Sequence, residues 1–318
     1  MSTARPLILA LGTTPTLQRT LRFDHLRSGE VNRASSVAEY ASGKPINVAR
    51  VAIALGHDSH VLVPLGGARG ESVRLDLKAA GIQGDFVASG VETRLCITAI
   101  DDSSRIATEL VEEHAPLPPH IGDRLLEHLE RRFAEARCLV LTGSLAPGIA
   151  RDFYATAIRM ARSAGVSTLL DASGEPLRAA LGERPDIVKI NRAELSDTLG
   201  RAVAPTEVPA AMRELQGRFG GSIVVTDGAA GSYAGNGPEL WRLNTPRVAA
   251  LSPIGSGDAF SAGLAAAIVD GLEIPEGCRR GAACGAANAL SPLAGHLDAS
   301  RIGQLLTQVT LTPLHAAH

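Results

Sequence analysis

The residues best suited to chemistry lie late in the chain, in the stretch Gly255-Ser256-Gly257-Asp258, which an apolar run follows. Small residues let the backbone approach a ligand closely. A helix beginning near Asp258 would offer unpaired N–H groups and its positive dipole end to an anion. A carboxylate in the same turn could take a proton from a hydroxyl group. The stretch therefore favours phosphoryl transfer to an alcohol, with a plain loop capped by Asp258 as the alternative.

Length and composition are those of an ordinary globular protein. The 318 residues are 45% hydrophobic and 20% charged, enough for one large α/β domain or two smaller ones. A net charge of −2 and an aromatic content of 3% argue against nucleic acid and membranes as partners. Any anionic ligand must therefore be held by local groups.

The four cysteines form no CxxC pair and no metal-ligand cluster in the sequence. We therefore expect buried free thiols and a reducing, cytoplasmic location. The first apolar run, Leu7–Leu11, breaks at Gly12 and is too short for a signal peptide or a membrane span, so we interpret it as a first strand.

Short apolar runs alternate with amphipathic segments along most of the chain. The expected strands are Leu7–Leu11, Ser59–Val63, Cys138–Thr142, Thr168–Asp171, Ile187–Ile190 and Ser222–Thr226. The expected helices are Ile46–Leu55, Glu71–Ala80, Ile121–Ala136, Arg151–Ala164 and Glu207–Phe219. Continuous apolar runs are typical of strands covered on both faces. Their alternation with helices predicts an α/β fold, a mostly parallel central sheet with helices on both faces.

Two segments interrupt this alternation, at about residues 16–40 and 92–113. Both have mixed polarity and no helical period, and we expect them to pair as a small β-sheet that stands off the core as a lid. Edge strands or long loops are the alternative. We expect residues 1–318 to form a single domain, with the lid inserted in it.

Small or polar residues follow almost every expected strand. In open α/β sheets, ligands bind outside the carboxyl ends of the strands, so these residues should gather at one edge. They are Gly12-Thr13-Thr14, Gly66-Gly67, Gly143-Ser144, Asp171, Lys189-Ile190-Asn191 and Thr226-Asp227-Gly228.

Two motifs carry a resemblance to a known family. One is Gly255-Ser256-Gly257-Asp258 with Ala262-Gly263, and the other is Gly43-Lys44-Pro45-Ile46-Asn47-Val48-Ala49 with Gly56 and Gly66. In this order and at this separation they resemble the PfkB family of ribokinase-like carbohydrate kinases, over essentially the whole chain. The resemblance implies the ribokinase-like three-layer fold with a small β lid, and ATP and Mg²⁺ as cofactors. It also allows a homodimer paired through the lids.

Further motifs resemble the branch of the family that phosphorylates hexose phosphates. They are Glu30-Val31-Asn32-Arg33, Glu92-Thr93-Arg94-Leu95-Cys96-Ile97, Thr142-Gly143-Ser144-Leu145-Ala146-Pro147-Gly148 and Asp171-Ala172-Ser173-Gly174-Glu175. The resemblance implies that Arg94 holds the phosphate already on the sugar, for which a guanidinium offers two parallel hydrogen bonds. A charge on a strand surface is the alternative for Arg94. Lys44 is a second candidate for binding an anion in the sugar site. The full set of implied acceptor contacts is Gln18, Gly43, Lys44, Asn47, Arg94 and Ser144.

The nucleotide and metal elements of the family also have counterparts. Lys189-Ile190-Asn191-Arg192-Ala193-Glu194 resembles its Lys-x-Asn-x-x-Glu element, which implies Mg²⁺ near Asn191 and Glu194 and phosphates near Lys189. A helix capped by Asn191 and Glu194 is compatible with that role. Thr226-Asp227-Gly228-Ala229-Ala230-Gly231 resembles the nucleotide loop. The implied ATP contacts are Lys189, Thr226, Gly228, Gly231, Gly257 and, against the adenine, Asn288.

The departures from the family pattern lie mainly in the sugar pocket. Gln18 stands where many relatives have an Asp that accepts sugar hydroxyls, and Pro45 stiffens its loop and removes an N–H donor. Because the ATP side matches the family, we interpret the chain as a working kinase. Asp258 would be its base, and the N–H groups of Gly255–Asp258 would donate hydrogen bonds to the phosphoryl group during its transfer. A kinase of an unphosphorylated sugar or nucleoside, and a nucleotide-binding regulator without catalysis, remain open.

Overall fold

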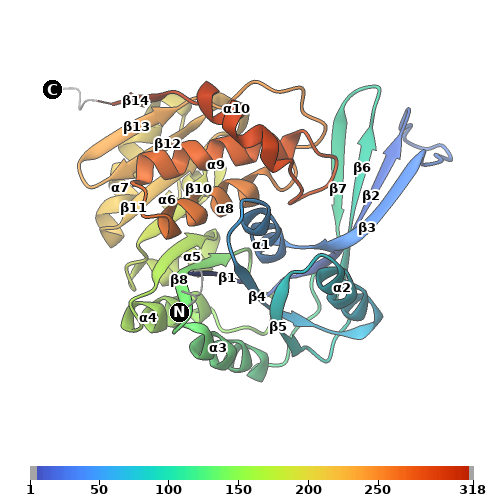
Figure 1. Ribbon diagram of the computed structural model, residues 1–318, viewed down its shortest axis with the longest axis horizontal. Helices are drawn as coiled ribbons and strands as arrows, with labels where there is room; N and C mark the ends of the chain where they lie inside the picture. Colours follow the sequence, from blue (N-terminus) through green and yellow to red (C-terminus); the bar gives the residue numbers. More distant parts are fainter. Residues whose placement is uncertain (1–5, 315–318) are drawn as a thin grey trace.

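The computed structural model describes residues 6–314, which form two β-sheets and ten α-helices (Figure 1). The larger sheet has the order β14-β13-β12-β11-β10-β9-β8-β1-β4-β5. Its strands are β1 (Leu7–Leu11), β4 (Ser59–Leu65), β5 (Gln83–Ala88), β8 (Ala136–Thr142), β9 (Ser167–Asp171), β10 (Ile187–Asn191), β11 (Ser222–Thr226), β12 (Ser232–Asn236), β13 (Glu239–Leu243) and β14 (Leu311–Pro313). The neighbours from β5 to β11 are paired in parallel, whereas β12, β13 and β14 extend the sheet antiparallel.

Helices cover both faces of this sheet. They are α1 (Lys44–Ala54), α2 (Gly67–Ala79), α3 (His120–Arg132), α4 (Phe153–Ser163), α5 (Gly174–Leu181), α6 (Arg192–Leu199), α7 (Val208–Phe219), α8 (Ser256–Val269), α9 (Ile274–Ala289) and α10 (Ile302–Gln308). Helices α3 to α7 share one hydrophobic core with one face, and α1, α2, α8, α9 and α10 share a second core with the other. The predicted three-layer α/β fold is confirmed.

The alternation of side chains along each strand explains why the core strands are apolar throughout. In β1, Leu9 and Leu11 enter one core while Ile8 and Ala10 enter the other, and all four are fully buried. Because successive residues point to opposite faces, a strand with helices on both sides has no polar face. Cys138, in β8, is buried for the same reason. All four cysteines are buried free thiols, as the sequence predicts.

The expected elements are present, with shifted ends. Helix α2 begins at Gly67 rather than Glu71, and α3 ends at Arg132 because residues from Ala136 onward belong to β8. Strand β5 and the antiparallel strands β12 to β14 were not among the expected strands. In the part of the chain that the structure describes, no helix has the length and hydropathy needed to cross a membrane.

The second sheet has four strands in the order β3-β2-β6-β7, which are β2 (Thr16–Phe23), β3 (Ser36–Ser42), β6 (Arg94–Asp101) and β7 (Ile106–Val111). These strands lie within the two segments expected to pair, except that β3 ends two residues beyond the first one, at Ser42. Figure 1 shows the small sheet projecting from the core beside α1 and α2. We call it the lid sheet.

Candidate active site

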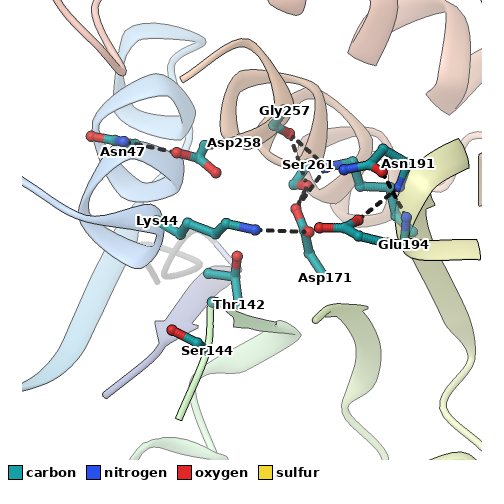
Figure 2. A network of polar contacts seen from close by, with 12 residues as sticks. Lys44, Asn47, Thr142, Ser144, Asp171, Asn191, Glu194, Gly257, Asp258 and Ser261 are labelled. Atoms are coloured by element: carbon teal, nitrogen blue, oxygen red, sulfur yellow. Dashed lines mark hydrogen bonds and ion pairs between the residues drawn. The ribbon is translucent and has the colours of Figure 1, made fainter. Parts of the chain in front are cut away.

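Two helices that are distant in sequence begin at the same place, beyond the carboxyl ends of the central strands. Helix α1 starts at Lys44 and α8 at Ser256, and the two helices pack together. Across their first turns, the Asn47 amide donates a 2.8 Å hydrogen bond to the Asp258 carboxylate (Figure 2). Two helix N-termini with their unpaired N–H groups therefore face one space, which favours an anion.

The loop before α8 has a conformation that only glycine adopts easily. Gly255, at φ +82°, is the N-cap of α8, and a Cβ placed on it would come within 2.7 Å of the Gly295 nitrogen. Pro45 occupies the corresponding first turn of α1, where a missing N–H disturbs no helical hydrogen bond.

Asn288 supports this loop from beneath. Its amide donates to the carbonyl of Ile254 at 2.8 Å, and its Oδ1 accepts the N–H of Gly295 at 2.9 Å. The residue is fully buried, and both polar atoms of its side chain are bonded within the protein. Asn288 therefore positions the loop, and its expected contact with the adenine stays a prediction.

A buried cluster of charges centred on Asp171 lies beside the two helix starts. The Asp171 carboxylate is 1% exposed and receives the Lys189 ammonium at 2.8 Å and the Ser261 hydroxyl at 2.6 Å. Lys189 and Ser261 also donate to the carbonyl of Gly257, each at 3.1 Å. The cluster thus ties the end of β9 to the first turn of α8, and Lys189, expected near the phosphates, lies directly under that turn.

Asp171 and Asp258 are both buried but differ in charge state. Burial alone would raise the pKa of Asp171, but the neighbouring Lys189 and Lys44 lower it to about 2. Burial raises the pKa of Asp258 to about 6, against the opposing effect of Lys44 and the hydrogen bond from Asn47. Asp171 is therefore a permanent counter-ion, whereas Asp258 can exchange a proton near neutral pH.

Lys44 is the third charged group of this cluster. Its ammonium lies 3.6 Å from Oδ1 of Asp171, and its side chain is 41% exposed. The pKa of Lys44 is raised, chiefly by Asp171 and further by Asp258 and Glu194, with burial opposing. Figure 2 shows the side chain reaching from α1 across to Asp171.

The proposed metal residues Asn191 and Glu194 form the capping box of α6. The Asn191 side chain accepts the Glu194 N–H at 2.9 Å, and the Glu194 carboxylate accepts the Asn191 N–H at 2.8 Å. Glu194 is half-buried and within electrostatic reach of Lys44. Mg²⁺ takes few protein ligands beside phosphates and water, so one such carboxylate fits it. Between residues 6 and 314, no three His, Cys, Asp or Glu side chains are grouped as a metal site.

The loop after β11 lies beside this capping box, since Thr226 is the parallel-strand partner of Asn191. Gly228 and Gly231 have positive φ angles of 53° and 111°, and a Cβ on Gly231 would collide with the Leu243 carbonyl. The loop thus has the tight, glycine-dependent path that the sequence predicts for a nucleotide loop.

One face of the lid sheet carries two of the expected acceptor residues. In the strand register, Thr16 pairs with Arg94 and Gln18 with Cys96, which places Gln18 and Arg94 on the same face. Gln18 is 2% exposed, and its amide donates to the Thr98 hydroxyl at 2.9 Å. The Arg94 guanidinium donates to the Thr14 carbonyl at 3.3 Å, but its buried Nε has no partner among residues 6–314. An unpaired cationic donor is costly unless a ligand satisfies it.

The loop after β8 completes the surroundings. Ser144 is exposed, and its carbonyl accepts the hydroxyls of Thr13 and Thr14. A Cβ on Gly43, which has a φ of +105°, would stand only 3.1 Å from the Thr14 carbonyl oxygen, so the starts of α1 and β2 lie in close contact. The structure thereby gathers Gly43, Lys44, Asn47 and Asp258 at the core, with Gln18 and Arg94 on the lid sheet.

Three residues of the site had no assigned role in the sequence analysis. Asp171, Ser261 and Thr142 are at most 1% exposed, and the Thr142 hydroxyl has no hydrogen-bond partner in the part of the chain that the structure describes. For Asp171 the usable signal was a carboxylate directly after a buried apolar strand, and it was one of the residues expected at the strand ends. Ser261 and Thr142 gave no signal beyond their neighbours, because serine and threonine are common in helices and strand ends.

Comparison with known proteins gives one family and consistent relatives. The model of the pfkB family of carbohydrate kinases matches residues 7–299. A tagatose-6-phosphate kinase from Staphylococcus epidermidis is 29% identical over 307 residues, covering 95% of this chain and 98% of that protein.

Solved structures agree with this match. Phosphofructokinase-2 from Escherichia coli in complex with fructose-6-phosphate has a TM-score of 0.83 and 26% identity, covering 96% of this chain and all of that one. The tetrameric inhibited form of that enzyme has a TM-score of 0.85 and 26% identity, covering 95% and 99%.

Proposed function

The chain belongs to the pfkB family of carbohydrate kinases, and from this membership we propose that it transfers the γ-phosphate of ATP to a hydroxyl group of a sugar phosphate. The family makes it a carbohydrate kinase with ATP as cosubstrate. The acceptor class, the base and the metal are our proposal. The buried free thiols support a cytoplasmic location.

The observation that carries the proposal is the environment of Asp258. Its carboxylate stands in the first turn of α8, is 7% exposed, and receives a hydrogen bond from Asn47 on one oxygen. Burial raises its pKa to about 6, close to the pH at which a general base works best. A carboxylate that only caps a helix needs neither burial nor a hydrogen bond from a second helix, here α1. The surroundings of Asp258 therefore favour a base over a cap.

The step that follows is an in-line transfer. The acceptor hydroxyl gives its proton to Asp258 while its oxygen bonds to the γ-phosphorus, and the bond from that phosphorus to the bridging oxygen of ADP breaks. The N–H groups of Gly255, Gly257 and Asp258 stabilise the charge on the transferring group. The N–H of Ser256, which we expected to join them, donates instead to the Pro253 carbonyl at 3.1 Å. Mg²⁺, when bound near Glu194 and Asn191, neutralises phosphate charge.

Two features support a phosphorylated acceptor. On the face of the lid sheet that carries Gln18, the buried Nε of Arg94 has no partner among the described residues. A phosphate would satisfy this donor, and a neutral sugar hydroxyl would do so less strongly. The relatives named for tagatose 6-phosphate and fructose 6-phosphate are consistent with a hexose phosphate. Gln18, Gly43, Asn47 and Ser144 are the proposed contacts to the rest of the sugar.

The deciding experiment is ATP consumption with Mg²⁺ on a panel of acceptors. The panel holds fructose 6-phosphate, fructose 1-phosphate, tagatose 6-phosphate, fructose, ribose and a nucleoside. We expect turnover on a phosphosugar, a loss of about 10²–10⁴-fold in Asp258→Asn, and a raised KM for the phosphosugar in Arg94→Met. Turnover confined to neutral acceptors would contradict the acceptor class. Full activity of Asp258→Asn would contradict the base.

A further inference from the structure

Two lysines contact Asp171, and they differ in how firmly they are held. Lys189 is 6% exposed and bonds to Asp171 at 2.8 Å and to the Gly257 carbonyl at 3.1 Å, so all its surroundings are protein. Lys44 is 41% exposed and lies 3.6 Å from Asp171, too far for a good hydrogen bond. Lys189 is therefore a structural counter-ion, and Lys44 is a cation that can leave Asp171 for a ligand.

The residues that the Lys44 side chain packs against also indicate a ligand-binding role for its ammonium. A Cβ on Gly143 would stand 3.8 Å from the Lys44 Cδ, so the stem of the lysine runs over this glycine. Next to it, the fully buried Thr142 hydroxyl has no partner within the described chain, and Figure 2 shows it pointing toward the space near the Lys44 ammonium and Asp171. The Lys44 ammonium and the Thr142 hydroxyl therefore face a space bordered by the first turn of α8.

We propose that Lys44 binds the phosphoryl group during transfer, and does not bind the phosphate that the acceptor already carries. This inference rests on the proposed function. Lys44 lies near Asp171, near the proposed base Asp258 and near the proposed metal ligand Glu194. Arg94, in contrast, is on the lid sheet. A phosphate near Lys44 would therefore lie at the base, where the reacting phosphorus must be.

The transfer then includes one exchange of partners. As the acceptor oxygen bonds to the γ-phosphorus and ADP leaves with the electron pair of the broken bond, negative charge remains on the oxygens of the transferring group. The Lys44 ammonium, already protonated, moves from Asp171 Oδ1 to one of these oxygens, and the Thr142 hydroxyl can donate to another. Asp171 stays neutralised because Lys189 and Ser261 remain on its Oδ2.

The test compares Lys44→Met, the charge-conserving Lys44→Arg and Arg94→Met on the same phosphosugar. For Lys44→Met we expect kcat to fall by about 10²–10³-fold, the cost of losing one donor to the developing charge, with KM for the acceptor within about twofold. Lys44→Arg should recover part of kcat. Arg94→Met should show the opposite pattern, a raised KM. If Lys44→Met raises the acceptor KM and spares kcat, the inference is overturned.

A binding measurement needs no turnover. Calorimetry of MgADP with aluminium fluoride, a mimic of the transferring group that carries no acceptor phosphate, should show at least tenfold weaker binding by Lys44→Met, with MgADP alone unaffected. Equal binding of the mimic by wild type and Lys44→Met would overturn the inference. If the protein turned over only neutral acceptors, the proposed phosphosugar acceptor would be refuted. The calorimetric measurement would still test the role of Lys44, because the mimic carries no acceptor phosphate. Thr142→Val, which removes the hydroxyl at constant shape, is the second variant and should also weaken the mimic.

Discussion

The side-chain amide of Asn47 holds the carboxylate of Asp258 through a 2.8 Å hydrogen bond between residues 211 positions apart. Asn47 is fixed in turn, because the Ser42 hydroxyl donates to its Oδ1 at 2.9 Å. Both partners of the bond are buried, at 4% and 7% exposure. One carboxylate oxygen of Asp258 is thereby fixed, and Figure 2 shows the other turned toward the site.

Replacing Asn47 by Leu should move the acid limb of the pH profile upward. Only deprotonated Asp258 accepts a proton, so wild-type kcat/KM should fall as the pH drops through about 6. The bond from Asn47 lowers the pKa of Asp258, so its loss raises that pKa and shifts the limb to higher pH. The measurement is kcat/KM against pH, with Ser42→Ala as the milder control. An unmoved limb in Asn47→Leu would contradict the role of this bond.

Replacing Asp171 by Asn should destabilise the fold strongly. The change leaves the Lys189 ammonium, 6% exposed, without its counter-ion, and breaking a buried pair in this way costs about 3–5 kcal/mol. Urea unfolding measures the loss. The control is Glu214→Gln, which removes exposed pairs with Arg201 and Arg218 and should change stability by about 0.5 kcal/mol or less. Equal effects of the two variants would refute the prediction.

In acid, the stability difference between wild type and Asp171→Asn should become smaller. The folded-state pKa of Asp171 is lowered to about 2 from 3.8, so the stability it contributes is fully present above about 4 and is lost as the pH falls toward 2. The difference in unfolding free energy between wild type and Asp171→Asn should therefore shrink over that interval. A constant difference down to pH 2 would show that the ion pair is not its source.

Replacing Gly255 by Ala should damage both stability and turnover. The added Cβ meets the Gly295 nitrogen at 2.7 Å at a φ of +82°, so the loop before α8 must move. Gly237→Ala is the matched control, because its φ of +56° carries the same left-handed penalty of about 1–2 kcal/mol, and an added Cβ meets none of the described residues within 4 Å. We expect the control to keep its turnover and Gly255→Ala to lose at least about tenfold. Similar turnover in both would mean that the loop path is unimportant.

The outer face of the lid sheet should bind a second copy of the chain. Val37, Ile106 and Leu110 are 57–60% exposed, and the strand register places them on one face of the sheet, opposite Gln18 and Arg94. Apolar patches of this kind mark association surfaces. Sedimentation velocity should show a wild-type dimer that the double variant Val37→Asp, Leu110→Asp dissociates. Leu272→Asp, at an exposed position after α8, should leave the dimer intact, and a monomeric wild type would contradict the prediction.

The elements whose signals are local were predicted from the sequence. Strands β1 and β11 have the expected ends, because each is a continuous apolar run bounded by small or polar residues. The start of α8 follows from Gly255 and Asp258 in the same way. Strands β12 to β14 were missed because they are short and mixed in polarity: β14 has three residues and depends on pairing with β13.

For the candidate site, the sequence by itself determined which chemical groups are available and that most of them lie at the carboxyl ends of strands or the first turns of helices. Only the tertiary structure decided their partners. It joined Lys44 to Asp171, and it buried Asn288 beneath the loop before α8. The reason is physical: charge state and hydrogen bonding depend on distance and burial, and both are set by contacts between residues far apart in the chain.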